Sequence, residues 1–114
     1  MHELSIIASL FEIMEEKAQE KGSKAIVSVK LQVGKLSGVV PDLLFTAFDM
    51  YKKDTLARKA TLEIENIPLT IQCNTCGKTM VLDDIVFICS ECGSHDLKTV
   101  TGTELLLEKM ELEL

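Results

Sequence analysis

The sequence predicts an α+β fold in which two helices pack on a sheet of about three strands, with a small cysteine-bearing module inserted before the last strand. Three observations lead to this class. Two segments have apolar residues at helical spacing, three have alternating apolar and polar residues, and all four cysteines lie within residues 73–92. The 114 residues suffice for one compact domain, or for a small domain that carries a smaller module. We expect an α/β domain at 1–70, completed by a strand at 99–114, and the module at 71–98.

The first element is an amphipathic helix followed by a strand. From Leu4 to Ala18 the apolar residues recur at helical spacing, and glutamates take the other side; the apolar set is Leu4, Ile7, Ala8, Phe11, Met14 and Ala18, widened by Ile6, Leu10 and Ile13. Gly22 is a natural stop for this helix. The next segment alternates with period two, which predicts a strand that Gly34 ends and that buries Val27, Val29, Leu31 and Val33.

A second helix and a second strand follow. Pro41 and Asp42 begin the helix, because proline suits the first helical position and a carboxylate is favoured at the positive N-terminal end. We expect the helix to run to about Leu56. In the second strand, over 61–65, Leu62 and Ile64 alternate with polar residues, and Pro68 marks its exit.

The last segment, over 104–114, is again strand-like. Its leucines change parity along the segment, so either a bulge falls near 108–109 or both faces are partly buried. A loose tail is the alternative, but tails seldom carry so much leucine.

The four cysteines form two CxxC pairs, each followed directly by glycine. Cys73 and Cys76 make the first pair, Cys89 and Cys92 make the second, and 12 residues separate the two pairs. Two residues between cysteines let both sulfurs reach one ion from a tight turn, and two such turns complete a tetrahedral site. Zn(II) is the first choice for this site, and iron in the same sulfur cage is the main alternative. A thioredoxin-like redox pair would use a single CxxC at a helix start.

The segment between the two pairs indicates a zinc ribbon. Its halves, 79–82 and 85–88, are strand-like and are separated by two aspartates, so we expect them to form a hairpin. A module of this size cannot bury a sufficient core without the ion, so the metal is expected to be structural. Four thiolates also leave no open position for a catalytic water.

Composition excludes several classes of function. With 12 Lys and Arg against 18 Asp and Glu, the chain is unsuited to nucleic acid or an anionic membrane surface. No stretch approaches the length of an apolar membrane span. The few cysteines and the absence of a signal-like start predict a reducing, cytoplasmic location. We expect no enzyme, because the two histidines, His2 and His95, and the committed cysteines leave no nucleophile with a base.

The N-terminus is a candidate for a second metal site. The amine of Met1, the backbone nitrogen of His2 and the His2 imidazole can close adjacent chelate rings around one ion, with the carboxylate of Glu3 or a carboxylate from elsewhere as a further ligand. Such an N/O set in a plane is preferred by Ni(II) or Cu(II). The alternative is an ordinary exposed terminus. We expect His95, beside the second cysteine pair, to be a loop residue.

Taken together, these motifs resemble the HypA family, the hydrogenase nickel-incorporation metallochaperones. The resemblance covers essentially the whole chain and is carried by the opening Met1–Ser5, the strand end Val33-Gly34, the helix start Pro41-Asp42, the run Cys89–Ser94 and the final Gly102–Leu105. It implies delivery of Ni(II) during maturation of [NiFe]-hydrogenase, with the GTPase HypB and the hydrogenase large-subunit precursor as partners.

The resemblance also implies a division of roles among residues. The 1–70 domain is then the nickel-binding domain, with Met1 (amine), His2 and Glu3 as ligands and Asp42 as a further candidate, while Cys73, Cys76, Cys89 and Cys92 hold zinc. The rival hypotheses are a zinc-ribbon adaptor that binds proteins without a second metal, and a rubredoxin-like iron protein. Whether the protein is a monomer or a homodimer stays open.

Overall fold

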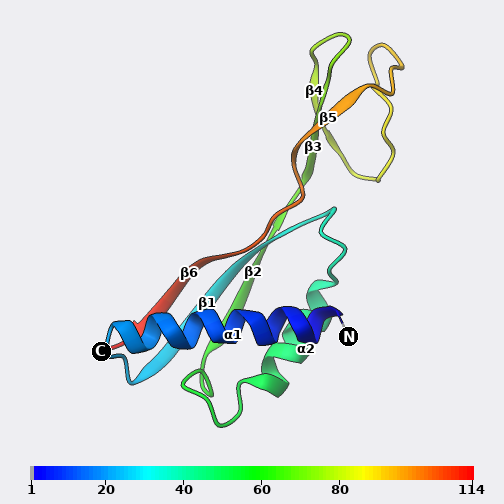
Figure 1. The fold of residues 1–114 in the computed structure, drawn as a ribbon. Helices are drawn as coiled ribbons and strands as arrows, with labels where there is room; N and C mark the ends of the chain where they lie inside the picture. Colours follow the sequence, from blue (N-terminus) through cyan, green and yellow to red (C-terminus); the bar gives the residue numbers. More distant parts are fainter. Residues whose placement is uncertain (1) are drawn as a thin grey trace. The chain divides into compact units, whose positions relative to one another are not determined.

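The structure is a computed structural model that describes residues 2–114, apart from the side chain of His2. The described chain has two helices and six strands, and the predicted α+β class is confirmed (Figure 1). In order they are α1 (His2–Glu20), β1 (Ala25–Gly34), α2 (Pro41–Tyr51), β2 (Thr61–Ile67), β3 (Leu69–Cys73), β4 (Thr79–Leu82), β5 (Leu97–Thr101) and β6 (Leu105–Glu113). Neither helix is long and apolar enough to cross a membrane.

The described residues fall into two compact units. The helical unit runs to Gln32 and continues over Val39–Glu65 and Leu106–Leu114. The cysteine unit consists of Val33–Gly38 and Asn66–Leu105. Strands β1, β2 and β6 each contribute residues to both units.

The two helices of the helical unit pack on each other through aromatic rings. The ring of Phe11 in α1 lies 5.4 Å from that of Phe48 and 4.9 Å from that of Tyr51, both in α2. The buried apolar side chains of α1 lie at the predicted helical spacing: Ile7, Leu10, Phe11, Met14 and Ala18. Leu4 and Ile13, which the sequence pattern places on the same apolar face, are instead 40% and 46% exposed, so the buried face is narrower than predicted.

The first sheet is three-stranded, as the sequence predicts, and its strand order is β2-β1-β6. Val29, Leu31 and Val33 are buried along β1. The prediction for Val27 is wrong, because Val27 is exposed and Ile26 is buried in its place. The backbone N–H of Ile26 donates to the carbonyl of Leu56, so the loop after α2 holds the start of β1.

Helix α2 begins at Pro41 as predicted but ends at Tyr51, so the expected extension to about Leu56 is wrong. The N–H of Lys52 still donates to the carbonyl of Phe48, and beyond it the chain turns. The hydroxyl of Thr55 donates to the carbonyl of Lys52 at 2.6 Å, and Asp54 has a φ of 63°. A left-handed residue and a side chain that bonds the local backbone both end a helix, whatever the apolar pattern beyond them.

The last strand is β6, so a loose tail is excluded. Its half-buried side chains change parity between Leu107 and Met110, at the place where the leucine pattern of the sequence changes.

The second sheet, in the cysteine unit, has the order β4-β3-β5. Strand β3 pairs antiparallel with both neighbours; Ile71, for example, lies opposite Met80 and Thr99. The predicted hairpin between 79–82 and 85–88 is therefore wrong, since 79–82 pairs with β3 and 85–88 belongs to neither sheet. The first CxxC turn reverses the chain directly from β3 to β4. The strand that pairs with 79–82 is therefore β3, which leads into the first cysteine pair and does not lie between the two pairs.

The chain leaves β1 through a close backbone crossing within the cysteine unit. The N–H of Gly34 donates to the carbonyl of Glu104, and the N–H of Leu36 to that of Gly102, both at 2.7 Å. A Cβ on Gly34 would lie 2.1 Å from the carbonyl oxygen of Gly102, so no other residue fits without moving backbone. The segment after this crossing leads to the start of α2.

Candidate metal centre

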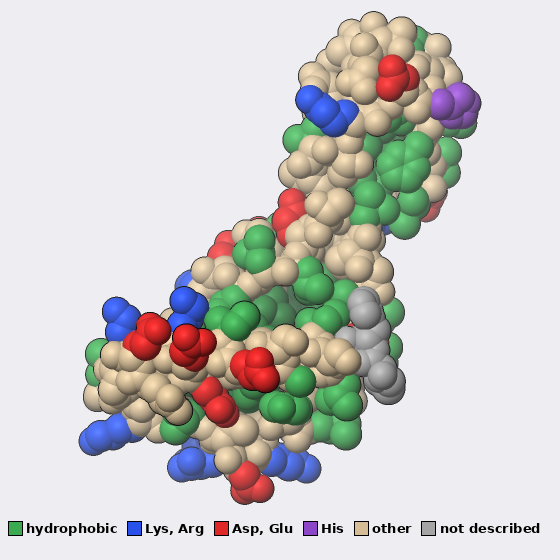
Figure 2. Space-filling model, in the orientation of Figure 1, with side chains coloured by type: hydrophobic (Ala, Val, Ile, Leu, Met, Phe, Trp, Pro, Cys, Tyr) green, Lys and Arg blue, Asp and Glu red, His purple; other side chains and the backbone are tan. Residues whose placement is uncertain are grey.

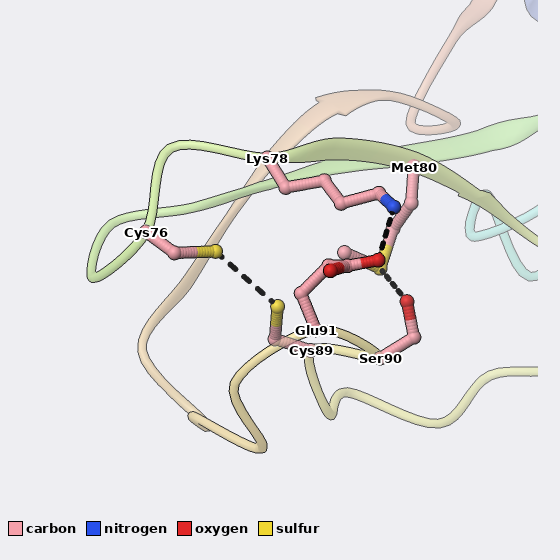
Figure 3. A network of polar contacts seen from close by, with 6 residues as sticks. All are labelled: Cys76, Lys78, Met80, Cys89, Ser90 and Glu91. Carbon is pink, nitrogen blue, oxygen red and sulfur yellow. Dashed lines mark hydrogen bonds and ion pairs between the residues drawn. The ribbon is translucent and has the colours of Figure 1, made fainter.

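The four cysteine sulfurs converge at one point of the cysteine unit. All four lie within 4.8 Å of one another, the sulfurs of Cys73 and Cys92 are 3.6 Å apart, and those of Cys76 and Cys89 are also 3.6 Å apart. Figure 3 shows the last two side chains pointing toward each other from the two turns. Four thiol groups at this spacing can surround one tetrahedral metal ion.

Each CxxC pair forms the same tight turn. The N–H of Gly77 donates to the carbonyl of Cys73, and the N–H of Gly93 to that of Cys89, both at 2.9 Å. These glycines have φ values of 80° and 72°, which L side chains rarely adopt. The turns aim amide groups at sulfur: the N–H groups of Thr75 and Cys76 each lie 3.4 Å from the sulfur of Cys73.

The turns also favour the thiolate form of the first cysteine in each pair. The N–H of Cys76, assisted by that of Thr75, lowers the pKa of the buried Cys73 thiol to about 6. The N–H of Cys92 likewise lowers the pKa of the Cys89 thiol, which is also buried. Because the thiolate is the form that binds metal, the backbone prepares both groups as ligands.

Polar contacts join the two turns to each other. The ammonium of Lys78 lies 2.6 Å from the carboxylate of Glu91, and the hydroxyl of Ser90 donates to the sulfur of Met80 at 3.7 Å (Figure 3). The carboxylate raises the pKa of Lys78, and the ammonium lowers the pKa of Glu91. Sequence reasoning missed this pair, although a lysine just after the first CxxC motif and a glutamate inside the second were a signal for it.

A second set of contacts joins the first turn to the loop after Cys92. The backbone and side-chain N–H groups of Asn74 donate to the backbone and side-chain oxygens of Asp96, at 2.9 and 3.1 Å. The hydroxyls of Thr75 and Ser94 are 2.9 Å apart. His95 lies in this loop, with its Nδ1 atom 3.2 Å from the carbonyl oxygen of Phe87.

The candidate nickel ligands are only partly described. The amine of Met1 and the imidazole of His2 lie outside the described residues. Glu3 is buried in the first turn of α1, and its Oε2 atom accepts a hydrogen bond of 3.4 Å from the N–H of Val40. Asp42 is exposed in the first turn of α2. Among the described side chains, the cysteine cluster is the only group of three or more potential metal ligands.

The fold and this site define a small α+β protein with a four-cysteine metal-binding module. A family model described as hydrogenase/urease nickel incorporation, metallochaperone, hypA, matches residues 1–112. The hydrogenase maturation factor HypA of Aquifex aeolicus (strain VF5) is 39% identical over 113 residues, which are 99% of this chain and 98% of that protein. The hydrogenase maturation factor HypA of Roseiflexus sp. (strain RS-1) is 44% identical over 114 residues, which are 99% of this chain and 93% of that protein.

Solved structures show the same fold. A solution structure of the Ni metallochaperone HypA from Helicobacter pylori matches with a TM-score of 0.68 at 24% identity, covering 97% of each chain. A solution structure of a HypA protein matches with a TM-score of 0.72 at 25% identity, covering 98% of this chain and 96% of that one. The chain belongs to the HypA family of hydrogenase maturation factors, which are metallochaperones and not catalytic enzymes. The family resemblance and the prediction of a non-enzyme are confirmed.

Proposed function

We propose that this protein binds Ni(II) at its N-terminus and delivers it during maturation of [NiFe]-hydrogenase, while its four cysteines hold a structural Zn(II). Membership of a hydrogenase/urease nickel-incorporation family over 1–112 supports the general role. The observation that carries the N-terminal site is the hydrogen bond from Val40 to Glu3, which ties the first turn of α1 to the residue just before α2.

Zinc is the proposed ion of the cysteine cluster for a chemical reason. Four sulfurs suit a tetrahedral ion without redox chemistry, and the cysteine unit has a small core of its own in which Leu69 and Ile71 are buried. Four thiolates complete the coordination, so the ion has no open position for substrate. Iron in the same cage would be coloured, so the spectrum of the purified protein distinguishes the two metals.

Nickel is assigned to the N-terminus because the donors there are nitrogen and oxygen. The proposed ligands are the Met1 amine, His2 and Glu3, with Asp42 as an additional candidate at the start of α2. A carboxylate offers several acceptor sites on two oxygens, so the bond from Val40 is compatible with a ligand role for Glu3. A shallow N/O site binds nickel yet releases it more readily than a thiolate cage, and protonation of the ligands favours release.

The remaining parts of the proposal concern organisation and partners. The nickel-binding domain is assigned to 1–70 with 99–114, and the zinc ribbon to 71–98. The partners are the GTPase HypB and the hydrogenase large-subunit precursor, the location is the cytoplasm, and the protein acts as a monomer or a homodimer. A hydrogenase maturation factor must meet its maturation partners, which supports the assignment of partners in general terms.

The test is calorimetric titration of Ni(II) into untagged, zinc-loaded protein, beside the variants His2→Ala and His95→Ala, with zinc counted by elemental analysis in each. We expect one nickel in the parent and in His95→Ala, none in His2→Ala, and one zinc in all three. An N-terminal tag that blocks the Met1 amine should have the same effect as His2→Ala.

Two results would contradict the proposal. Equal nickel binding by the parent and His2→Ala would place the nickel site elsewhere. If the parent takes up no nickel at micromolar concentrations while zinc is retained, a zinc-ribbon adaptor without a second metal becomes the better description.

A further inference from the structure

Four consecutive apolar residues lie on the surface of the cysteine unit. Ile85, Val86, Phe87 and Ile88 are 55%, 54%, 38% and 45% exposed, and they belong to neither sheet. Figure 2 shows hydrophobic side chains on the surface of this unit. Single exposed apolar residues are ordinary, but an uninterrupted exposed run is typical of an interaction site. We refer to 85–88 as the apolar segment.

The stretch of sequence that contains the apolar segment is acidic. Between residues 79 and 97 the chain has no lysine or arginine but four acidic residues, Asp83, Asp84, Glu91 and Asp96. Asp83 and Asp84 directly precede the segment and are exposed. Lys78, the nearest preceding cation in the sequence, is paired with Glu91. Four thiolates around one divalent ion would add further negative charge.

The apolar segment is held at both ends. It follows β4, which is paired with β3, and it runs directly into Cys89, one of the four clustered cysteines. Within it, the N–H of Val86 donates to the carbonyl of Asp84 at 2.9 Å, and the carbonyl oxygen of Phe87 lies 3.2 Å from Nδ1 of His95. A segment fixed in this way loses little conformational entropy when it binds.

We propose that the apolar segment, with Asp83 and Asp84 beside it, is a docking surface for a protein segment that carries apolar and basic side chains. The apolar residues supply the contact area, and the aspartates favour lysine or arginine on the partner. Charge repulsion disfavours nucleic acid and anionic lipid. It also disfavours a second copy of this chain, which has a formal charge of −6.

The test measures binding of a fluorescent peptide of alternating leucine and lysine to the metal-loaded full chain by anisotropy. We expect the double variant Val86→Ser with Phe87→Ser to weaken binding about 10-fold or more. Asp83→Asn with Asp84→Asn should weaken it about threefold and flatten its dependence on salt. The matched control is Ile13→Ser, which removes an apolar side chain of similar exposure from α1 and should leave binding unchanged.

Metal content and circular dichroism establish that each variant is folded. If Val86→Ser with Phe87→Ser loses metal, Ile85→Ser with Val86→Ser replaces it, because these positions lie further from Cys89 in the sequence. Unchanged peptide affinity in the folded variant overturns the proposal. So does a serine–lysine peptide that binds as tightly as the leucine–lysine peptide, because the surface would then recognise charge alone.

Two further outcomes would assign the surface to another occupant and so overturn the proposal. One is flotation with phosphatidylcholine vesicles that depends on Val86 and Phe87, which indicates a lipid surface. The other is a concentration-dependent dimer that the same variant abolishes, which indicates a second copy. None of these measurements uses nickel, so this inference and the proposed nickel site can fail independently.

Discussion

The carboxylate of Glu3 accepts a hydrogen bond from the backbone N–H of Val40, 37 residues further along the chain. Val40 is the residue before α2 and has an extended backbone conformation, with no side-chain cap on that helix. A buried carboxylate from α1 therefore occupies a position just outside the N-terminal end of α2, where negative charge is favoured. One side chain thus serves the packing of the two helices as well as the proposed nickel site.

These two roles of Glu3 can be separated by substitution. Glu3→Ala leaves the Val40 N–H without this acceptor and should lower the free energy of unfolding by about 1–2 kcal/mol, whereas Glu3→Gln keeps an oxygen acceptor and should cost less. Urea unfolding followed by circular dichroism measures both. If the carboxylate is also a nickel ligand, Glu3→Gln weakens nickel binding with little loss of stability. Equal stability of Glu3→Ala and the parent would show that the hydrogen bond contributes nothing.

The backbone crossing at Gly34 predicts a large steric effect. A Cβ there would lie 2.1 Å from the Gly102 oxygen, so we expect Gly34→Ala to destabilise the protein by about 3 kcal/mol or more. Gly38→Ala is the control, because a Cβ at Gly38 would have no heavy atom within 4 Å. Its φ of 77° alone should lower the free energy of unfolding, by about 1–2 kcal/mol. Thermal unfolding of the two variants compares these costs. A smaller loss for Gly34→Ala than for Gly38→Ala would contradict the close approach.

Glu108 on β6 predicts a dependence of stability on pH. The amide of Gln32 at 2.8 Å and the ammonium of Lys30 at 3.1 Å lower the pKa of the Glu108 carboxyl below its ordinary value of 4.5. Because the folded-state pKa is lowered, this carboxylate adds stability above pH 4.5, and the contribution is lost as pH falls through the folded value.

Glu108→Gln lacks this titration, so its free energy of unfolding should fall less than that of the parent between about pH 5 and 3. Urea unfolding over this range measures the difference. Carboxyl NMR titration of Glu108 should show an upward pKa shift in both Gln32→Leu and Lys30→Met. If the free energies of unfolding of the parent and Glu108→Gln change equally with pH, the contacts of Glu108 with Gln32 and Lys30 do not stabilise the protein.

Loss of one cysteine should unfold the cysteine unit selectively. Cys73→Ser removes a buried ligand, so we expect less than one metal ion per chain and loss of amide protection over 69–101, while the helices keep theirs. Ser90→Ala is the control, since Ser90 lies in the second turn and donates to Met80 without being a ligand. Elemental analysis and hydrogen exchange report the outcome. A full complement of metal in Cys73→Ser would exclude the four-sulfur site.

The predictable parts of this fold are those whose pattern is local. The period of α1, the proline at the start of α2 and the alternation of Val29 to Val33 each identify an element from its own residues, because one face of each is buried. The end of α2 was missed because Thr55 and Asp54 form a turn through local hydrogen bonds and a left-handed backbone, which hydropathy does not register.

The cysteine unit shows more plainly which features a sequence pattern can predict and which it cannot. The CxxC spacing identifies the four-sulfur cluster, since the local separation brings together the sulfurs of each pair and two such pairs suit one ion. The strand pairing could not be read in the same way. An apolar run such as 85–88 fits a buried strand and an exposed binding segment equally well, and only the pairing of β4 with β3 decides between them. The contact between Glu3 and Val40 joins distant residues and had no local signal.

The strand order β2-β1-β6 has a consequence for synthesis of the chain. On the ribosome, β1 emerges early, whereas its neighbour β6 emerges only after the whole 69–101 segment has been made. The edge of β1 that pairs with β6 therefore stays unpaired at a stage when all four cysteines have been synthesised and can bind an ion. Metal uptake by the nascent chain can thus precede closure of the first sheet.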